Sequence, residues 1–600
     1  MQEMLRKVLK LIDRRDRPKV LILVALMIVT AFVQTAGVAS VMPFLAVLSD
    51  PEMAHSNAAL NLVFNSLGFN SESSFLYFLG IAAFVVFMSG TALQALTSWA
   101  ITRFSHMQQY ELSRRLMADY LKRSYTFFLR RNSGDLAKTI LEETNHAIGG
   151  AVMPAMRLAS QGLLALFIII LLIVVEPYLA LTVALALGSI YGAIYMVARS
   201  WLSRIGKDRV EANRQRFTAA AETFAGAKEI RLLGRERDYL ERYREPSKRY
   251  ANHLANATLL KSIPQYAIEA IAFGGVLLLI LFLMAGEGGL VHALPLIGLY
   301  ALAGRKLIPA FQNIFATVAR LRFTNAAVES ILKDLGVQAD SSPLPSRRIV
   351  AAPLEPQDAI RMIDVTYHYP GSELVAIDGL SLTIRANTTV GFIGSSGAGK
   401  STLVDLLLGL LVPDQGEIRI DEIRLDVGNV RNWQAALGYV PQHIFLADQS
   451  VAANIALGVP QAQIDYPAVE KAARLANLHD FVTRELPRGY DTRIGERGTR
   501  LSGGQRQRIG IARALYRDPA VLFFDEATSA LDTATERAVM DAIHQLAGNK
   551  TIVMVAHRLS TVRSCDLIYV LDRGRVTAHG AWDDLAASSI AFRNLAAGAV

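Results

Sequence analysis

One run of eight residues in the C-terminal half has the composition of a phosphate-binding loop. It reads Gly394-Ser395-Ser396-Gly397-Ala398-Gly399-Lys400-Ser401 and matches the pattern G-x-x-x-x-G-K-[ST], between the strand-like run 389–393 and the helical run 402–411. Glycines let backbone N–H groups converge on phosphate oxygens, and the N-terminus of the following helix adds a favourable dipole. We expect Gly394 to Thr402 to bind nucleotide phosphates, with Lys400 bridging the outer phosphates and Ser401 coordinating Mg²⁺.

A second run supplies the acids that such a site needs. The apolar residues 521–524 are followed directly by Asp525 and Glu526. A strand that ends in two solvated acids is common in isolation, so this assignment depends on the phosphate-binding loop upstream. Together with that loop, the pair predicts that Asp525 holds Mg²⁺ through water and that Glu526 polarises an attacking water.

A third run carries a family resemblance. Leu501-Ser502-Gly503-Gly504-Gln505 is the signature sequence of ATP-binding cassette proteins, and the region 361–578 resembles their cassette. Other motifs of that family occur in the expected order. Tyr369 resembles the aromatic residue that stacks on adenine, and Gln442 resembles the loop glutamine that senses Mg²⁺ and contacts the membrane domain. The loop 495–498 looks like one peculiar to exporters.

The resemblance also implies roles for individual residues. Asp532 matches the loop that joins the two sites of a dimer, and His557 matches the switch histidine that contacts the terminal phosphate. The resemblance therefore implies ATP and Mg²⁺ as ligands. The implied catalytic residues are Glu526, His557 and Gln442. The implied Mg²⁺ ligands are Ser401, Gln442 and Asp525. The implied ATP contacts are Tyr369, the phosphate-binding residues, Ser502, Gly503, Gly504, Gln505 and Asp532.

The elements before this cassette are strongly apolar. Residues 20–49 and 73–102 contain no charge, and 158–175 and 177–198 are separated only by Glu176. All four meet the length of about 20 apolar residues needed to cross a bilayer. Two weaker spans, 263–286 and 289–319, contain Glu269, Arg305 and Lys306. The sequence thus predicts a six-helix transmembrane domain followed by an α/β phosphate-loop nucleotide-binding domain.

Loop charges predict the orientation of these spans. Segments 103–145 and 199–261 carry eight and fifteen Lys or Arg residues, whereas segments 50–72 and 287–292 carry none. The positive-inside rule places the two basic segments, both termini and the cassette in the cytoplasm, and we expect a bacterial inner membrane. The net charge of +9 is then explained by topology, so we expect no nucleic acid partner.

Composition completes the predicted domain organisation. Residues 1–19 mix leucines with basic residues and predict an interfacial amphipathic helix. Residues 20–335 form the transmembrane domain, with long helical cytoplasmic loops at about 103–147 and 199–262. The proline- and serine-rich residues 336–358 are a linker, and 359–600 form the cassette. The single Cys565 forms no internal disulfide.

This order of domains resembles half-transporters of the type IV exporter fold. Ser133 to Leu136 resembles the first coupling helix of that family, and 222–236 the stretch around the second. In this family each ATP lies between one cassette's phosphate-binding loop and its partner's signature. One of each per chain implies a dimer, and the intact Glu526 and signature favour two identical subunits.

The membrane half most resembles flippases for lipid-linked oligosaccharides. The likeness lies in residues 40–44, 263–264, 305–309 and 313–314, and in a short outward-facing helix at 57–67. It implies a lipid-linked or other amphiphilic substrate. An exporter of lipid A, drugs or peptides is the alternative, and a regulatory or channel-like member is a lesser one.

Charged residues inside the last two spans are the substrate candidates. Arg305 and Lys306 lie within the sixth span, and Glu269 lies at a similar depth in the fifth. Ionisable groups within a membrane are costly and face a cavity or a partner. Three readings stay open: an interhelical ion pair with Glu269, a cationic contact for a lipid phosphate, or a side chain that extends to the headgroups.

Overall fold

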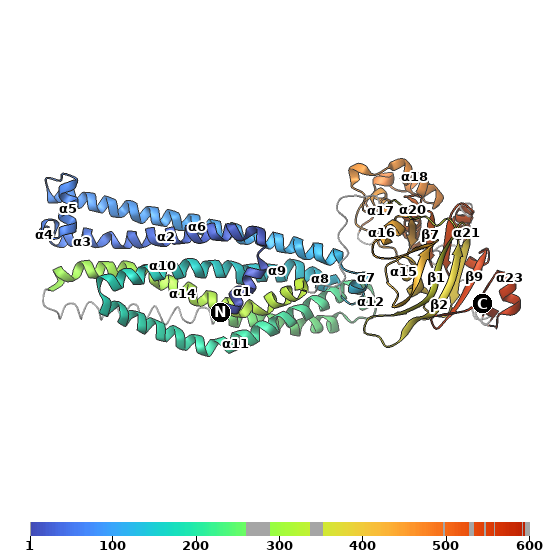
Figure 1. The fold of residues 1–600 in the computed structure, drawn as a ribbon, viewed down its shortest axis with the longest axis horizontal. Helices are drawn as coiled ribbons and strands as arrows, with labels where there is room; N and C mark the ends of the chain where they lie inside the picture. Colours follow the sequence, from blue (N-terminus) through green and yellow to red (C-terminus); the bar gives the residue numbers. More distant parts are fainter. Residues whose placement is uncertain are drawn as a thin grey trace. The chain divides into compact units, whose positions relative to one another are not determined.

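The computed structural model describes residues 2–131, 133–259, 289–336, 352–495, 498–526, 533–544, 548–556, 559–590 and 592–593. The chain forms two compact units. Figure 1 draws the fold as a ribbon coloured along the sequence. The first comprises Met1–Arg123 and Arg131–Ser341, and the second comprises Ser124–Arg130 and Ser342–Val600. The division at residue 341 falls within the predicted linker, of which 337–351 lie outside the described residues.

Helices make up the first unit. They are α1 (Gln2–Leu11), η1 (Arg14–Asp16), α2 (Arg17–Ala39), α3 (Val41–Ser49), α4 (Met53–Ser56), α5 (Ala58–Ser66), α6 (Glu72–Lys122), α8 (Ser133–Lys138), η2 (Thr139–Glu143), α9 (Thr144–Ala147), η3 (Ile148–Val152), α10 (Met153–Val175), α11 (Pro177–Ala225), α12 (Ala227–Leu232) and α14 (Gly289–Gly336). Residues 236–259 are also helical.

Several of these helices are much longer than a bilayer is thick. Helix α6 has 51 residues, or about 76 Å at 1.5 Å per residue, against a hydrocarbon core of roughly 30 Å. In the part of the chain that the structure describes, three helical runs are long and apolar enough to cross a membrane: Arg17–Ser49, Glu72–Lys122 and Gly134–Val175. The predicted fifth span, with Glu269, lies outside the described residues. The spans therefore continue as helices into the predicted cytoplasmic segments.

The first span is broken at one point. Helix α2 ends at Ala39 and α3 begins at Val41, and the Ser40 hydroxyl donates to the Gly37 carbonyl at 2.9 Å. Pro43 has no N–H with which to continue the helical ladder, which accounts for the break. Further on, α5 begins where the short outward-facing helix is predicted, and the Asn57 side chain caps it by accepting from the N–H groups of Ala59 and Leu60.

The helix that leads into α10 contains two π-helical segments, η2 and η3. Such segments are rare, and they often occur at functional sites. Gly150 in η3 lies against α14, because a Cβ there would come within 2.5 Å of the Thr324 hydroxyl oxygen. The absence of a side chain at Gly150 thus allows close packing of η3 on α14.

The N-terminal helix packs on the same unit. Val8, Leu11 and Ile12 are buried, and the Lys7 ammonium pairs with Glu329 of α14 at 2.9 Å. Its apolar face is therefore covered by protein at these positions, while Leu9 is exposed. That this helix contacts the lipid interface stays a prediction.

The second unit combines helices and strands. Its helices are α7 (Tyr125–Leu129), α15 (Lys400–Leu407), α16 (Val430–Ala435), α17 (Val451–Ile455), η4 (Gln461–Gln463), α18 (Tyr466–Leu475), α19 (His479–Arg484), η5 (Gly489–Asp491), α20 (Gly503–Leu515), α21 (Thr533–His544), α22 (Leu559–Val562) and α23 (Trp582–Ser588). Its strands are β1 (Ala359–His368), β2 (Val375–Arg385), β3 (Thr389–Gly394), β4 (Gln415–Ile420), β5 (Ile423–Arg424), β6 (Leu437–Val440), β7 (Val521–Asp525), β8 (Thr551–Val555), β9 (Leu567–Asp572) and β10 (Arg575–Gly580).

Two sheets position the chemistry of this unit. The larger has the order β10-β9-β3-β8-β7-β6, in which only β10 is antiparallel to its neighbour. The smaller, β2-β1-β4-β5, is antiparallel throughout. Strands β3 and β7 both end at the carboxyl edge of the parallel sheet, separated by β8 alone. The phosphate-binding loop and the acidic pair are therefore brought to the same edge, where α/β sheets bind ligands.

Candidate nucleotide and substrate sites

The phosphate-binding loop follows β3 and leads into α15. Gly397 and Gly399 have φ angles of +82° and +96°, which strain any residue with a side chain. A Cβ at Gly399 would also lie 2.8 Å from the Ala376 carbonyl oxygen. The glycines of the motif are thus required by backbone shape as well as by access of phosphate to the N–H groups.

Lys400 is the buried cation of this loop. Its ammonium donates to the carbonyls of Gly394 and Ser395 at 2.8 and 3.0 Å, and the residue is 7% exposed. Burial lowers the pKa of Lys400, against the opposing effect of Glu526 and Asp525. The lysine, the loop and both acids therefore lie within electrostatic reach of one another.

The two acids occupy distinct positions. Asp525 is the last residue of β7, and Glu526 follows with a φ of +51°, which is uncommon for a residue with a side chain. The Glu526 N–H donates to the Val555 carbonyl at 3.0 Å, and the Gln442 amide donates to Glu526 Oε2 at 2.6 Å. The structure thus brings Gln442 and Glu526 together, although 84 residues separate them in sequence.

The oxygen donors near the loop suit Mg²⁺. Ser401 lies in the first turn of α15, Asp525 ends β7, and Gln442 contacts Glu526. Hydroxyl, carboxylate and amide oxygens are the ligands that this hard cation prefers. Next to them, Tyr369 shares a hydrogen bond of 3.0 Å with the Thr402 hydroxyl, so the predicted adenine-stacking residue is tied to the same helix.

Two further residues of this region lie outside the family motifs and were not predicted from the sequence. Asp405, in α15, is half-buried, and burial together with the charge of Asp525 raises its pKa to about 6. Burial, with Asp525 and Asp405 nearby, also raises the pKa of Tyr439. Asp405 lies four residues after Ser401 on α15, on the face that packs against the sheet, and its helical run gives no signal of an ionisable partner.

The signature segment forms the start of α20. Ser502 caps this helix by accepting from the Gln505 N–H at 3.2 Å, and the Ser502 N–H donates to Gln505 Oε1 at 2.8 Å. This reciprocal capping box fixes Gly503 and Gly504 in the first turn. A helix N-terminus of this kind offers N–H groups to an anion. The predicted residues Asp532 and His557, and Glu496 and Arg497 of the loop before the signature, lie outside the described residues.

A polar cavity of about 300 Å³ lies in the first unit. Its polar lining comes from α2, α6, α10 and α14: Thr30, Gln94, Thr97, Ser98, Arg157, Ser160, Gln161, Asn313, Thr317 and Arg320. Arg157 and Arg320 are both exposed, and they lie close enough for their charges to repel. Among the described residues, neither has a carboxylate partner. The cavity therefore has the cations and hydrogen-bonding groups to hold an anion.

The substrate candidates predicted from the sequence lie elsewhere. The Lys306 ammonium donates to Gln34 Oε1 at 3.3 Å and lies 5.4 Å from the centre of the Phe87 ring. Arg305 is exposed, and neither residue lines the cavity. Glu269 is outside the described residues, so its pairing stays a prediction. The sequence analysis did not single out Arg157 and Arg320, although each is the first charge at the predicted cytoplasmic end of an apolar run, which was the available signal.

The segment that resembles the first coupling helix and the segment that groups with the cassette are adjacent in the chain. Ser133 to Leu136 begins α8 in the first unit, whereas the segment that groups with the cassette is Ser124–Arg130, which contains α7. Helix α7 carries adjacent aromatic rings, with the Phe127 and Phe128 ring centres 5.4 Å apart. The role of 133–136 as a coupling segment stays a prediction.

Comparison with known proteins agrees with this architecture. Residues 19–286 match the model of the ABC transporter transmembrane region, and residues 377–529 match the ABC transporter model. The solved structure of a bacterial Atm1-family ABC exporter with ATP bound superposes with a TM-score of 0.79 at 24% identity, over 98% of this chain and 99% of that one. The chain thus has the type IV exporter fold.

Curated relatives define the class further. An ATP-dependent lipid A-core flippase of Pseudomonas fluorescens is 31% identical over 77% of this chain and 76% of its own length. The heterocyst differentiation ATP-binding protein HepA of Nostoc sp. is 31% identical over 77% of this chain and 74% of its own length. A Polaromonas lipid A-core flippase is 30% identical over 88% of both chains. The chain therefore belongs to the ABC transporter family. It is a membrane-spanning exporter that couples ATP hydrolysis to transport.

Proposed function

We propose that this exporter is a homodimer that uses ATP and Mg²⁺ to flip a lipid with an anionic headgroup across a bacterial inner membrane. A lipid-linked oligosaccharide or another glycolipid is the substrate that fits best. The observation that carries this proposal is the cavity with Arg157 and Arg320. An anionic headgroup would relieve the repulsion between two guanidinium groups that have no described carboxylate partner.

The rest of the cavity lining supports a sugar-bearing headgroup. Hydroxyl and amide side chains from four helices converge there, and the Thr30 and Thr97 hydroxyls share a hydrogen bond of 2.7 Å. Carbohydrate hydroxyls are matched by such mixed donors and acceptors. Arg157 and Arg320 lie at the predicted cytoplasmic ends of their spans, so the headgroup would enter from the cytoplasmic leaflet.

A second candidate is export of lipid A. Several relatives are named lipid A-core flippases, and an anionic lipid would use the same cations. The two candidates share the need for Arg157 and Arg320. They differ in which lipid stimulates ATP hydrolysis.

Exposed apolar residues support the proposal that a second copy of the chain binds to this one. Phe224, Leu232 and Leu233 are 81%, 83% and 70% exposed, in the segment that resembles the second coupling helix. This segment lies in a predicted cytoplasmic region, where lipid would not cover these side chains. We infer that the partner subunit covers them. The single phosphate-binding loop and the single signature sequence in the chain also favour a dimer.

Stimulation of ATP hydrolysis tests the substrate class. Purified protein in liposomes of neutral lipid is expected to hydrolyse ATP faster when a polyprenyl-pyrophosphate-linked glycan is added, and this stimulation is lost in Arg157→Gln/Arg320→Gln. Arg103→Gln is the matched control, because Arg103 is an exposed arginine on α6 that does not line the cavity. Stimulation by lipid A alone favours the second candidate. Equal stimulation of the double variant and the wild type would contradict both.

A further inference from the structure

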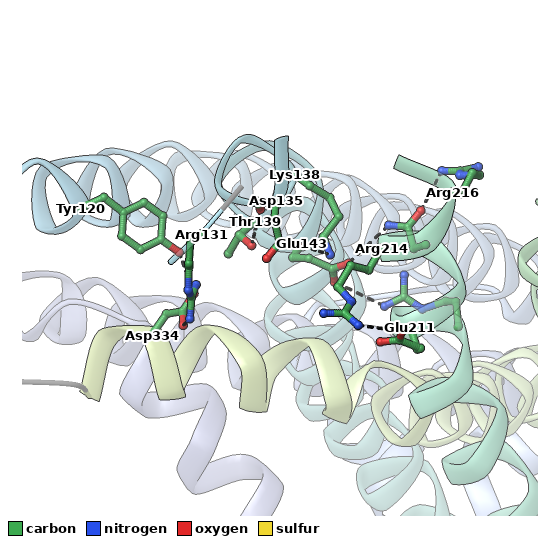
Figure 2. A network of polar contacts seen from close by, with 12 residues as sticks. Tyr120, Arg131, Asp135, Lys138, Thr139, Glu143, Glu211, Arg214, Arg216 and Asp334 are labelled. Carbon is green, nitrogen blue, oxygen red and sulfur yellow. Dashed lines mark hydrogen bonds and ion pairs between the residues drawn. The ribbon is translucent and has the colours of Figure 1, made fainter. Parts of the chain in front are cut away.

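A buried carboxylate near the end of α14 joins this helix to α6 and to the loop before α8. Asp334 is 6% exposed, and the Tyr120 hydroxyl of α6 donates to its Oδ2 at 2.7 Å. The Arg131 guanidinium donates to both carboxylate oxygens at 3.0 Å. Figure 2 shows Tyr120 and Arg131 both directed at Asp334 on α14. Two parallel N–H···O bonds of this kind are among the strongest and most directional contacts in proteins.

The backbone of the same residue is also bound. Arg123 donates from Nη2 to the Asp334 carbonyl oxygen and to Asp119 Oδ2, the latter at 2.8 Å. The Arg123 side chain is only 6% exposed. Burial and the hydrogen bond to Asp334 raise the pKa of Tyr120, so its hydroxyl stays protonated and continues to donate. We call Tyr120, Arg123, Arg131 and Asp334 the Asp334 clamp.

The Asp334 clamp lies at the points where the chain leaves the first unit. Arg123 and Arg131 immediately flank Ser124–Arg130, the part of the first cytoplasmic segment that groups with the cassette unit. Asp334 lies in the last turn of α14, from which the chain continues to the cassette. Both stretches of chain that join the two units therefore leave the first unit beside one carboxylate.

A second buried ion pair in the same unit shows that this arrangement is not a general feature of its polar interior. Glu143 and Arg209 are each 1% exposed, but their closest atoms are 3.5 Å apart. Glu143 Oε2 and all three Arg209 nitrogens have no hydrogen-bond partner among the described residues. The Asp334 carboxylate, by contrast, has directed bonds on both oxygens.

We propose that Asp334 is a positioning residue that couples ATP turnover to movement of the membrane helices. It fixes both ends of segment 124–130 to the end of α14, so a displacement of the cassette moves α6, α8 and α14 together. This proposal concerns the exporter's coupling and does not depend on the identity of the substrate.

Hydrogen–deuterium exchange of the full-length protein tests the proposal without a transported substrate. Exchange is compared with and without ATP, Mg²⁺ and orthovanadate, in the wild type and in Asp334→Asn. In the wild type, addition of ATP, Mg²⁺ and orthovanadate is expected to change hydrogen–deuterium exchange in peptides of both units. In Asp334→Asn the cassette peptides respond as in the wild type and basal ATP hydrolysis is unchanged. The response of membrane-unit peptides falls by about fivefold or more, the lower end of typical coupling factors.

Three further variants keep the test decisive. Arg131→Gln, which leaves Asp334 and its bond from Tyr120 in place, is expected to show the same uncoupling. Glu111→Gln is the matched control, since Glu111 pairs with Arg114 on the same helix α6 and, among the described residues, forms no ion pair with another element. The exchange Arg131→Asp with Asp334→Arg is expected to restore the response if Asp334→Asn lowers stability. A membrane-unit response equal to wild type in Asp334→Asn and Arg131→Gln would overturn the proposal. A restored fold without a restored response, or no wild-type response in the membrane unit, would also overturn it.

Discussion

The nucleotide site and the polar cavity of the membrane unit are built in opposite ways. Eight consecutive residues from Gly394 to Ser401 supply the phosphate-binding loop, and Asp525 and Glu526 are adjacent in sequence. The cavity takes its polar residues from four helices that are far apart in sequence, and its two arginines are 163 positions apart, at 157 and 320. Binding of a nucleotide, which is the same ligand in every member of the family, fixes a local motif. Recognition of a variable cargo needs only charges and hydrogen-bonding groups at the right places.

The largest expected effect comes from replacing Glu526, the predicted general base of the nucleotide site. In Glu526→Gln the side chain keeps its shape but cannot accept a proton from water, so ATP hydrolysis is expected to fall by on the order of 10²-fold or more. Binding of ATP is expected to persist, because Lys400 and the loop are unchanged. Near-normal hydrolysis by the purified variant would remove Glu526 from this role.

The next prediction tests whether two chains share each site. Lys400→Ala and Ser502→Arg are each expected to abolish nearly all ATP hydrolysis when they are the only chain present. A mixed dimer contains one site with an intact loop from one chain and an intact signature from the other. Nucleotide binding is therefore expected to return in part when the two variants are co-purified under different tags. A strictly monomeric preparation with full activity would rule out the shared site.

These two regions also differ in what the sequence reveals. Strand order in a parallel sheet brings the ends of β3 and β7 to one edge, so the proximity of Lys400 to Asp525 and Glu526 could be expected from the motifs. Gln442 donates to Glu526, and the catalytic and metal-binding roles of these residues stay predictions. Arg157 and Arg320 could not be predicted as a pair, since their proximity depends on the packing of α10 against α14. Arg305 and Lys306 were predicted as substrate candidates from their position inside a span. Lys306 donates to Gln34 and neither residue lines the cavity, so their role in substrate binding stays a prediction. The role of Asp334 could not be predicted from the sequence, because its partners Tyr120 and Arg131 are 214 and 203 positions away.

The smallest expected effect concerns Asp405 beside the nucleotide site. Its folded-state pKa, about 6, is above the ordinary value of 3.8, so folding favours the protonated acid. Its contribution to stability is present below pH 3.8 and is lost as the pH rises through about 6. Asp405→Asn is therefore expected to stabilise the nucleotide-free protein by about 1–2 kcal/mol at pH 8. At pH 4 it brings little gain. Thermal unfolding at both pH values measures this, and an equal change at both would contradict the assignment.

The central claim is that ATP hydrolysis in the cassette drives an anionic lipid headgroup through the cavity of Arg157 and Arg320. The most direct test reconstitutes the protein in liposomes that contain a polyprenyl-pyrophosphate-linked glycan and follows the loss of access to a glycan-cleaving enzyme added outside. The wild type is expected to protect the glycan only with ATP and Mg²⁺. Neither Glu526→Gln nor Arg157→Gln/Arg320→Gln protects it, and Arg103→Gln behaves as the wild type. Protection by the double-arginine variant at the wild-type rate would contradict the account, as would wild-type ATP hydrolysis that moves no anionic lipid.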